Sequence, residues 1–120
     1  MIINSHKIKK IINIFLNRGN DYVCPFCNYK SSNFYLKGLD NKVIKKYKII
    51  GAGRRVCGCY KCDSTDRERL VFIYLTKILK YKLDIKILHV APEKQLLKFL
   101  KNKFKHNYYY GDYFAKGYED

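Results

Sequence analysis

The sequence lacks any run of about 20 consecutive apolar residues, which is the length that a membrane-spanning helix needs. Lys7, Lys9 and Lys10 interrupt the N-terminal segment, so it does not offer the continuous apolar core of a signal peptide. No tract rich in proline, glycine or serine divides the chain, and 48% of its residues are apolar, which excludes an extended disordered protein. We therefore expect a folded, cytoplasmic protein with no membrane span.

Arginine and acidic residues are scarce as well. Five arginines and 20 lysines face 10 acidic residues, giving a net charge of +15 that would suit a polyanionic partner such as nucleic acid. However, lysine, asparagine, isoleucine and tyrosine, which all have A/T-rich codons, make up 54 of the 120 residues. Specific readers of nucleic acid also depend on arginine more than on lysine. We favour a solvated lysine surface, and a nucleic-acid role stays open.

The chain length allows one ordinary domain or two small units, which excludes a complete large enzyme. Within it lie five cysteines, an odd number that suits metal ligation in a reducing compartment better than a disulfide framework.

Four of these cysteines form two Cys-x-x-Cys motifs, Cys24 with Cys27 and Cys59 with Cys62. Each motif lets two thiolates reach one tetrahedral ion, so together they predict a closed four-cysteine site for structural Zn²⁺ with no open position for catalysis. Redox cysteines are the alternative, but that use would place the first motif at a helix N-terminus after a strand. Cys57 is the spare thiol, and it would replace Cys59 only if the motif spacing were lost.

Apolar periodicity divides the first half of the chain into a helix and a β unit. Apolar residues recur at helical spacing over residues 5–18, which predicts an amphipathic helix with Ser5 as N-cap and Gly19 at its C-terminus. Residues 33–37 and 43–50 read as strands, and residues 51–53 as a turn into the second cysteine pair.

After Cys62 the pattern becomes helical and then alternates. We expect a helix capped by Ser64 that ends near Tyr81, with an apolar face of Leu70, Ile73, Tyr74, Ile78 and Leu79. A strand over 85–90, a helix with Pro92 at its first position and a strand over 108–110 complete a βαβ unit with two parallel strands. The predicted fold class is α+β, with an N-terminal helix (1–20), a zinc-ribbon-like domain (21–64) and a third region (65–120).

Arg67 and Arg69 lie on the first turn of the helix after the second motif. Three roles remain open for them: to grip an anionic substrate, to fix the zinc unit to the next domain through carboxylates, or to pair within the helix with Asp66 or Glu68.

Several segments together resemble the front half of a bacterial family of class I S-adenosylmethionine-dependent methyltransferases with a zinc-ribbon-like head. The resemblance covers residues 22–120. It rests on the two cysteine motifs around a β insertion, Gly53-Arg54-Arg55, the CDSTDRERL segment (62–70), the ILHVAPE segment (87–93) and the Tyr-x-x-Gly-Asp segment (108–112).

This resemblance implies a Rossmann-like domain whose first strand is 85–90, with S-adenosylmethionine as cofactor and a small-molecule or unknown methyl acceptor. It implies cofactor-binding roles for His89 and Glu93, in the segment where the family carries a glycine-rich loop, and for Asp112, placed to accept from ribose hydroxyls. Here the segment 89–93 contains no glycine. His89 is read either as a general base or as a hydrogen-bonded structural histidine, and the catalytic residues are not identified.

Relative to that family, the chain ends before the later strands and the acceptor site. We therefore expect a truncated or split methyltransferase that is inactive alone, with a second polypeptide completing the sheet. The alternative is a non-enzymatic basic zinc-ribbon module that binds nucleic acid or a protein. A decayed gene fragment is the third interpretation.

Overall fold

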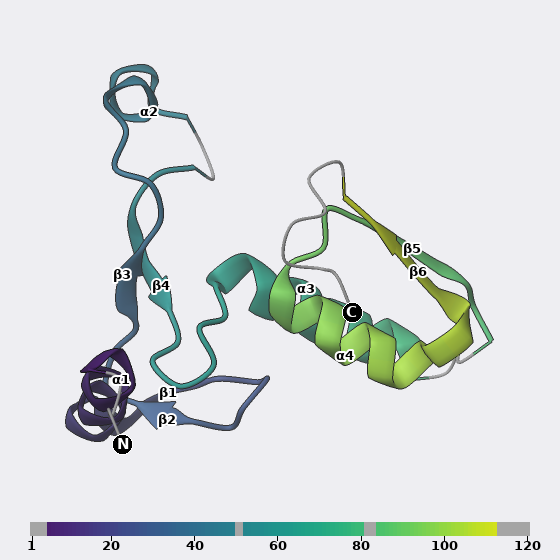
Figure 1. The fold of residues 1–120 in the computed structure, drawn as a ribbon, viewed down its shortest axis with the longest axis horizontal. Helices are drawn as coiled ribbons and strands as arrows, with labels where there is room; N and C mark the ends of the chain where they lie inside the picture. Colours follow the sequence, from purple (N-terminus) through teal and green to yellow (C-terminus); the bar gives the residue numbers. More distant parts are fainter. Residues whose placement is uncertain (1–4, 50–51, 81–83, 113–120) are drawn as a thin grey trace. The chain divides into compact units, whose positions relative to one another are not determined.

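A computed structural model of the chain describes residues 5–49, 52–80 and 84–112. The chain divides into two compact units, residues 1–69 (unit 1) and 70–120 (unit 2). The fold is mixed helix and strand, and the described strands form three two-stranded sheets (Figure 1). None of the helices in the described residues combines the length and the apolar character that a membrane crossing requires.

Unit 1 begins with helix α1 (Ser5–Leu16), which confirms the predicted amphipathic helix but not its end. Strand β1 (Arg18–Val23) follows almost at once and pairs antiparallel with β2 (Lys30–Ser31). The prediction of Gly19 as a helix C-terminal glycine is therefore wrong. A Cβ atom at Gly19 would lie 2.5 Å from the backbone nitrogen of Ser32, so glycine is needed there for close approach of two chain segments.

A second antiparallel pair joins β3 (Tyr35–Lys37) and β4 (Arg55–Gly58), and β3 confirms the strand predicted over 33–37. Between them, the strand predicted over 43–50 is wrong: the described part forms helix α2 (Lys42–Tyr47), and Ile50 lies outside the described residues. Local capping overrides the β-branched residues here. The Asn41 side chain accepts from the Val43 N–H at 2.8 Å, and Lys48 ends the helix in the left-handed conformation.

Helix α3 (Asp66–Leu79) crosses from unit 1 into unit 2 and ends close to the predicted position, although Tyr81 lies outside the described residues. Its predicted apolar face is wrong. Leu70, Ile73, Tyr74 and Ile78 are exposed in the structure, and the side chain of Leu79 lies outside what the structure describes. The packed side chains are Leu75, against the core of unit 2, and Phe72, whose ring centroid lies 4.6 Å from that of Phe99.

Unit 2 contains the predicted βαβ arrangement: β5 (Ile87–Val90), α4 (Lys94–Phe104), a 3₁₀ turn (Lys105–Asn107) and β6 (Tyr108–Gly111). The two strands are parallel, and α4 lies beside them (Figure 1). Glu93 is the N-cap of α4, so Pro92 precedes the helix and is not its first residue.

The core of unit 2 lies between α4 and one face of this sheet, and it contains Leu100, Phe104 and Tyr108. On the strands' other face, Leu88 and Val90 are 74% and 72% exposed, and Tyr109 is 52% exposed. One face of the parallel pair is thus apolar and open, whereas parallel sheets are ordinarily covered on both faces.

Candidate metal centre

The structure brings together the four cysteines of the two motifs, from segments more than 30 residues apart in sequence. The Sγ atoms of Cys24, Cys27, Cys59 and Cys62 all lie within 4.8 Å of one another. Across the motifs, Cys24 Sγ is 3.6 Å from Cys62 Sγ, and Cys27 Sγ is 3.7 Å from Cys59 Sγ. These distances are far longer than the roughly 2.05 Å bond of a disulfide, so the sulfurs form an open cage of free thiols.

The two motifs fold in the same way, which explains why they present their sulfurs so similarly. In the first, Cys24 N–H donates to Tyr29 O at 3.0 Å and Cys24 O accepts from Asn28 N–H at 2.8 Å. In the second, Cys59 N–H donates to Ser64 O and Cys59 O accepts from Asp63 N–H at the same two distances.

The residue after each second cysteine has a positive φ, 53° for Asn28 and 66° for Asp63. Asparagine and aspartate tolerate this left-handed conformation better than other residues with a side chain. The sequence thus encodes two equivalent turns.

The sulfur cage fits a tetrahedral zinc ion. With Zn–S bonds of about 2.3 Å, tetrahedral geometry separates the sulfurs by about 3.8 Å, close to the 3.6 Å and 3.7 Å observed across the motifs. Cys24 and Cys59 are buried and the other two are half-buried, so the donor set is largely shielded from bulk water. When bound, Zn²⁺ would supply cross-linking of the two turns, because four thiolates leave it no open coordination position.

The thiols perturb one another strongly, as closely packed ionisable groups do. Hydrogen bonds from Cys59 and Cys62 hold the pKa of Cys24 far below its usual value, and the bond shared with Cys24 raises the pKa of Cys59. Burial raises the pKa of Cys27 to about 11. Four neighbouring thiolates therefore need a compensating cation, because like charges disfavour each other's ionisation.

The Ser64 side chain contacts two sulfurs of the cage from outside the cluster. Its side chain is fully buried, and its Oγ lies 3.2 Å from Cys62 Sγ and 3.4 Å from Cys24 Sγ. A serine hydroxyl can donate to a thiolate ligand, which is how outer groups orient metal ligands. The prediction from the sequence that Ser64 caps the helix is wrong, because the Ser64 hydroxyl contacts the cysteine sulfurs instead.

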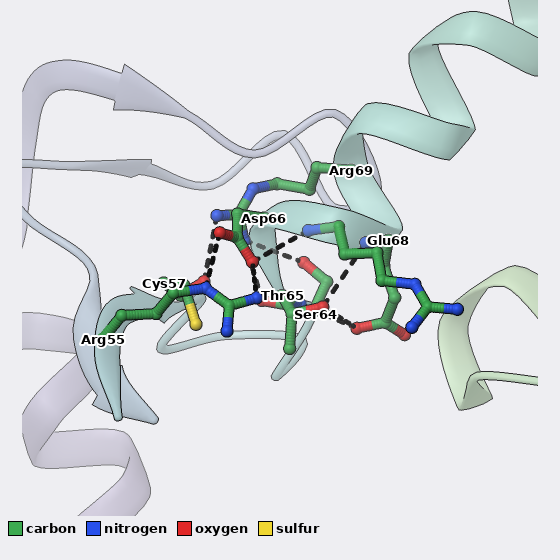
Figure 2. A network of polar contacts seen from close by, with 8 residues as sticks. Arg55, Cys57, Ser64, Thr65, Asp66, Glu68 and Arg69 are labelled. Atoms are coloured by element: carbon green, nitrogen blue, oxygen red, sulfur yellow. Dashed lines mark hydrogen bonds and ion pairs between the residues drawn. The ribbon is translucent and has the colours of Figure 1, made fainter. Parts of the chain in front are cut away.

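Arg69, from the first turns of α3, reaches back to this second turn (Figure 2). Its guanidinium donates to Ser64 O at 2.7 Å and to Cys57 O at 2.9 Å, and it stacks 4.0 Å from the centroid of the Phe34 ring. The acceptors of Arg69 are carbonyl oxygens, not the carboxylates expected from the sequence. The buried cation also opposes the excess negative charge that four thiolates leave on a divalent ion.

The start of α3 is fixed by a capping box between Thr65 and Glu68 (Figure 2). Thr65 N–H donates to Glu68 Oε2 at 2.7 Å, and Thr65 Oγ1 accepts from Glu68 N–H at 3.4 Å. Beside it, Arg55 of β4 forms a bidentate pair with Asp66, both contacts at 2.8 Å. This pairing lowers the pKa of Asp66 to about 2. The helix is therefore tied to the strand that leads into the second cysteine motif.

Cys57 is buried in β4 and lies outside the four-sulfur cluster. Its backbone carbonyl, and not its thiol, is what the structure uses in binding Arg69. The sequence-based choice of Cys59 as the ligand agrees with the cluster that the structure presents.

The other residues singled out from the sequence lie in unit 2, near the carboxyl ends of its parallel strands. His89 Nδ1 is 2.9 Å from the Tyr108 hydroxyl, and His89 Nε2 is 3.2 Å from Glu93 Oε2. The pairing of Val90 with Gly111 places Asp112 at the same strand edge as Ala91. The His89 ring thus has two specific partners, which agrees with the interpretation of His89 as a hydrogen-bonded structural histidine.

Sequence reasoning missed Ser64 and Arg69 as supports of the cage. A signal was present for Ser64, because it occupies the position in the second motif that Tyr29 occupies in the first, and its backbone closes the turn in the same way. The sequence contains no pattern that identifies the acceptors of Arg69, because they are backbone carbonyls that any residue could provide.

Comparisons with protein families, with curated proteins and with solved structures find no match for this chain. The interpretation of the site therefore rests on its own geometry.

Proposed function

We propose that unit 1 is a zinc-ribbon-like module whose fold depends on one structural Zn²⁺ held by Cys24, Cys27, Cys59 and Cys62. The observation that carries this proposal is the convergence of four Sγ atoms within 4.8 Å from two equivalently folded turns. A β unit of this size has little hydrophobic core, and zinc binding contributes on the order of 10 kcal/mol to the folding of small metal-binding domains.

Metal analysis of the purified full chain tests this proposal. We expect about one zinc per chain and, after Co²⁺ exchange, the thiolate-to-metal absorption of a tetrahedral tetrathiolate site. Cys24→Ser should abolish both together with the circular dichroism of unit 1. Cys57→Ser is the matched control, since Cys57 is an equally buried cysteine outside the cluster, and it should retain the metal. A folded chain without metal would overturn the proposal.

A second candidate function, methyl transfer, concerns unit 2. We propose that β5, α4 and β6 are the opening part of a Rossmann-like domain of an S-adenosylmethionine-dependent methyltransferase. Its support is the parallel pairing of β5 with β6, because open α/β sheets bind ligands at the carboxyl ends of parallel strands. Ala91, directly after β5, has a positive φ of 47° although the loop has no glycine, and its N–H donates to Gly111 O at 2.8 Å.

In this proposal Asp112 accepts from the ribose hydroxyls of the cofactor, while Glu93 and His89 shape the loop that precedes α4. A second polypeptide covers the open face formed by Leu88, Val90 and Tyr109 and brings the acceptor site. Methyl transfer mainly requires donor and acceptor to be held in line, and in this proposal the second polypeptide would provide that arrangement.

Calorimetric titration of the full chain with S-adenosylmethionine tests the cofactor assignment. Weak binding that is lost in Asp112→Ala and kept in Asp84→Ala, an exposed aspartate ahead of β5, would support it. The absence of any binding heat, with zinc loading and folding intact, would overturn it.

A further inference from the structure

Unit 1 contains a hollow of about 550 Å³ beside the metal centre that no part of the proposed zinc function uses. Its lining includes three cationic side chains, Arg18, Lys30 and Lys61, and no carboxylate. Asn20 and Asn28 add two amides, and the buried Tyr29 also lines the hollow. The volume lies within the range of small-ligand sites.

The three cations are available for an external anion. In the described parts of the chain, none of them is in an ion pair with a carboxylate. Arg18 lies 6.0 Å from the Phe15 ring centroid and interacts electrostatically with Tyr29. All three side chains are exposed, so the hollow opens to solvent and is suited to a linear polyanion passing across it.

The charge of unit 1 favours the same class of ligand. Fifteen of the 25 lysines and arginines but only five of the 10 acidic residues precede Leu70, so this unit carries a net charge of +10. Charge of this density draws nucleic acid to a protein through release of counterions from the phosphates. Asparagine amides add hydrogen-bond donors to phosphate oxygens.

We propose that this hollow binds a phosphate of a nucleic-acid backbone. Arg18 is the bidentate ligand of the phosphate, since its planar fork matches two phosphate oxygens, while Lys30 and Lys61 contribute point charges. The base identity is not read, because the lining offers cations and amides to the backbone and no exposed aromatic ring to stack a base.

The inference rests on the proposed zinc function because the two cysteine turns build two walls of the hollow. Asn28 directly follows Cys27, and Lys61 lies between Cys59 and Cys62. Cross-linking of the turns by the metal sets the separation of Lys61 from Asn28, so nucleic-acid binding should weaken when the metal is removed.

Fluorescence anisotropy of a labelled oligouridine of about 12 nucleotides tests the proposal on the zinc-loaded full chain. The key variant is the triple substitution Arg18→Gln, Lys30→Gln and Lys61→Gln. The matched control is Lys7→Gln, Lys42→Gln and Lys46→Gln, which removes the same charge from exposed positions of unit 1 outside the hollow. Zinc content and circular dichroism are measured on the same samples.

We expect the hollow variant to weaken binding by about 10-fold or more at moderate salt and to lower the slope of log K against log salt by about 0.7, as loss of one phosphate contact on a single strand requires. The control should change affinity by no more than about 3-fold. Equal losses in both variants, or no binding by the unaltered chain, would overturn the inference.

Two further measurements distinguish nucleic acid from other sources of phosphate. The outcomes also distinguish failure of this inference from failure of the proposed zinc function. Displacement of the RNA by millimolar inorganic phosphate, or equal Arg18-dependent binding to phosphatidylserine vesicles, would overturn a nucleic-acid role. If the zinc-loaded, folded protein does not bind the RNA, that result contradicts this inference alone. A folded chain without zinc contradicts the proposed function alone, and the same comparison of variants on that metal-free chain still decides the role of the hollow.

Discussion

The Arg69 guanidinium donates to the carbonyl oxygen of Ser64 at 2.7 Å, and Ser64 Oγ in turn lies 3.2 Å from Cys62 Sγ. The first turns of α3 are thereby fixed to one of the two turns that form the metal centre. Arg69 is only 8% exposed, so this link between the turn and the helix is a buried cation.

Arg69→Ala should therefore destabilise the zinc-loaded chain by about 2–3 kcal/mol, because two buried carbonyls lose a charged donor. Arg69→Lys should not restore stability, since one ammonium cannot replace a fork that bonds two carbonyls and stacks on Phe34. Urea unfolding followed by circular dichroism measures the effect. Arg67→Ala, at an exposed position on the same turn, is the control, and an equal loss in both alanine variants would contradict the assignment.

Ser64→Ala should lower zinc affinity by about 10-fold while leaving all four ligands in place, as removal of a group that orients ligands commonly does. The physical reason is the loss of the hydroxyl that lies 3.2 Å and 3.4 Å from two of the sulfurs. Competition with a chromophoric chelator measures the affinity. Ser32→Ala, at an exposed position of the same unit, should leave it unchanged. An unaltered affinity in Ser64→Ala would remove the serine from the metal site.

The four cysteines of the candidate metal centre were predictable from sequence because motif spacing determines which sulfurs could share an ion. The parallel strands of unit 2 were predictable for a similar reason, since the strand–helix–strand pattern has one common solution. In each case a pattern of residue types at fixed spacing carries the information, as with Cys24 and Cys27.

The errors arose where tertiary packing or capping overrode local pattern. Residues 43–47 have strand-forming side chains, yet Asn41 caps them into a helix. The face of α3 was assigned by counting apolar residues, but Phe72 and Leu75 are the ones that find partners in unit 2. Periodicity ranks helix faces by composition and contains no information about which face has something to pack against.

Gly19→Ala should destabilise unit 1 strongly, by about 2 kcal/mol or more, although the change adds one methyl group. That methyl carbon would lie 2.5 Å from a backbone nitrogen, which cannot move aside as a flexible side chain does. Thermal unfolding compares it with Gly111→Ala, where no atom lies within 4 Å of the added carbon. The control should change the melting temperature little. Similar behaviour of the two variants would mean that β1 and the segment at Ser32 do not approach as described.

The last prediction concerns Tyr108, whose buried hydroxyl lies 2.9 Å from His89 Nδ1. Burial raises its pKa to about 12 from the ordinary 10.0. Because the folded state holds this proton more tightly than the unfolded state, the group contributes its full stability below pH 10 and loses it as the pH rises through about 12. Stability of unit 2 should therefore decline over this alkaline window.

Tyr108→Phe should remove that part of the alkaline decline, since phenylalanine has no proton to lose, although it also costs the hydroxyl contact with His89 at neutral pH. Urea unfolding at a series of pH values between 9 and 12 measures the slope. Tyr109→Phe, at a residue that is 52% exposed on the neighbouring position of β6, is the matched control and should keep the slope of the unaltered chain. An identical slope in Tyr108→Phe would show that the burial of this hydroxyl is not what makes the unit sensitive to alkali.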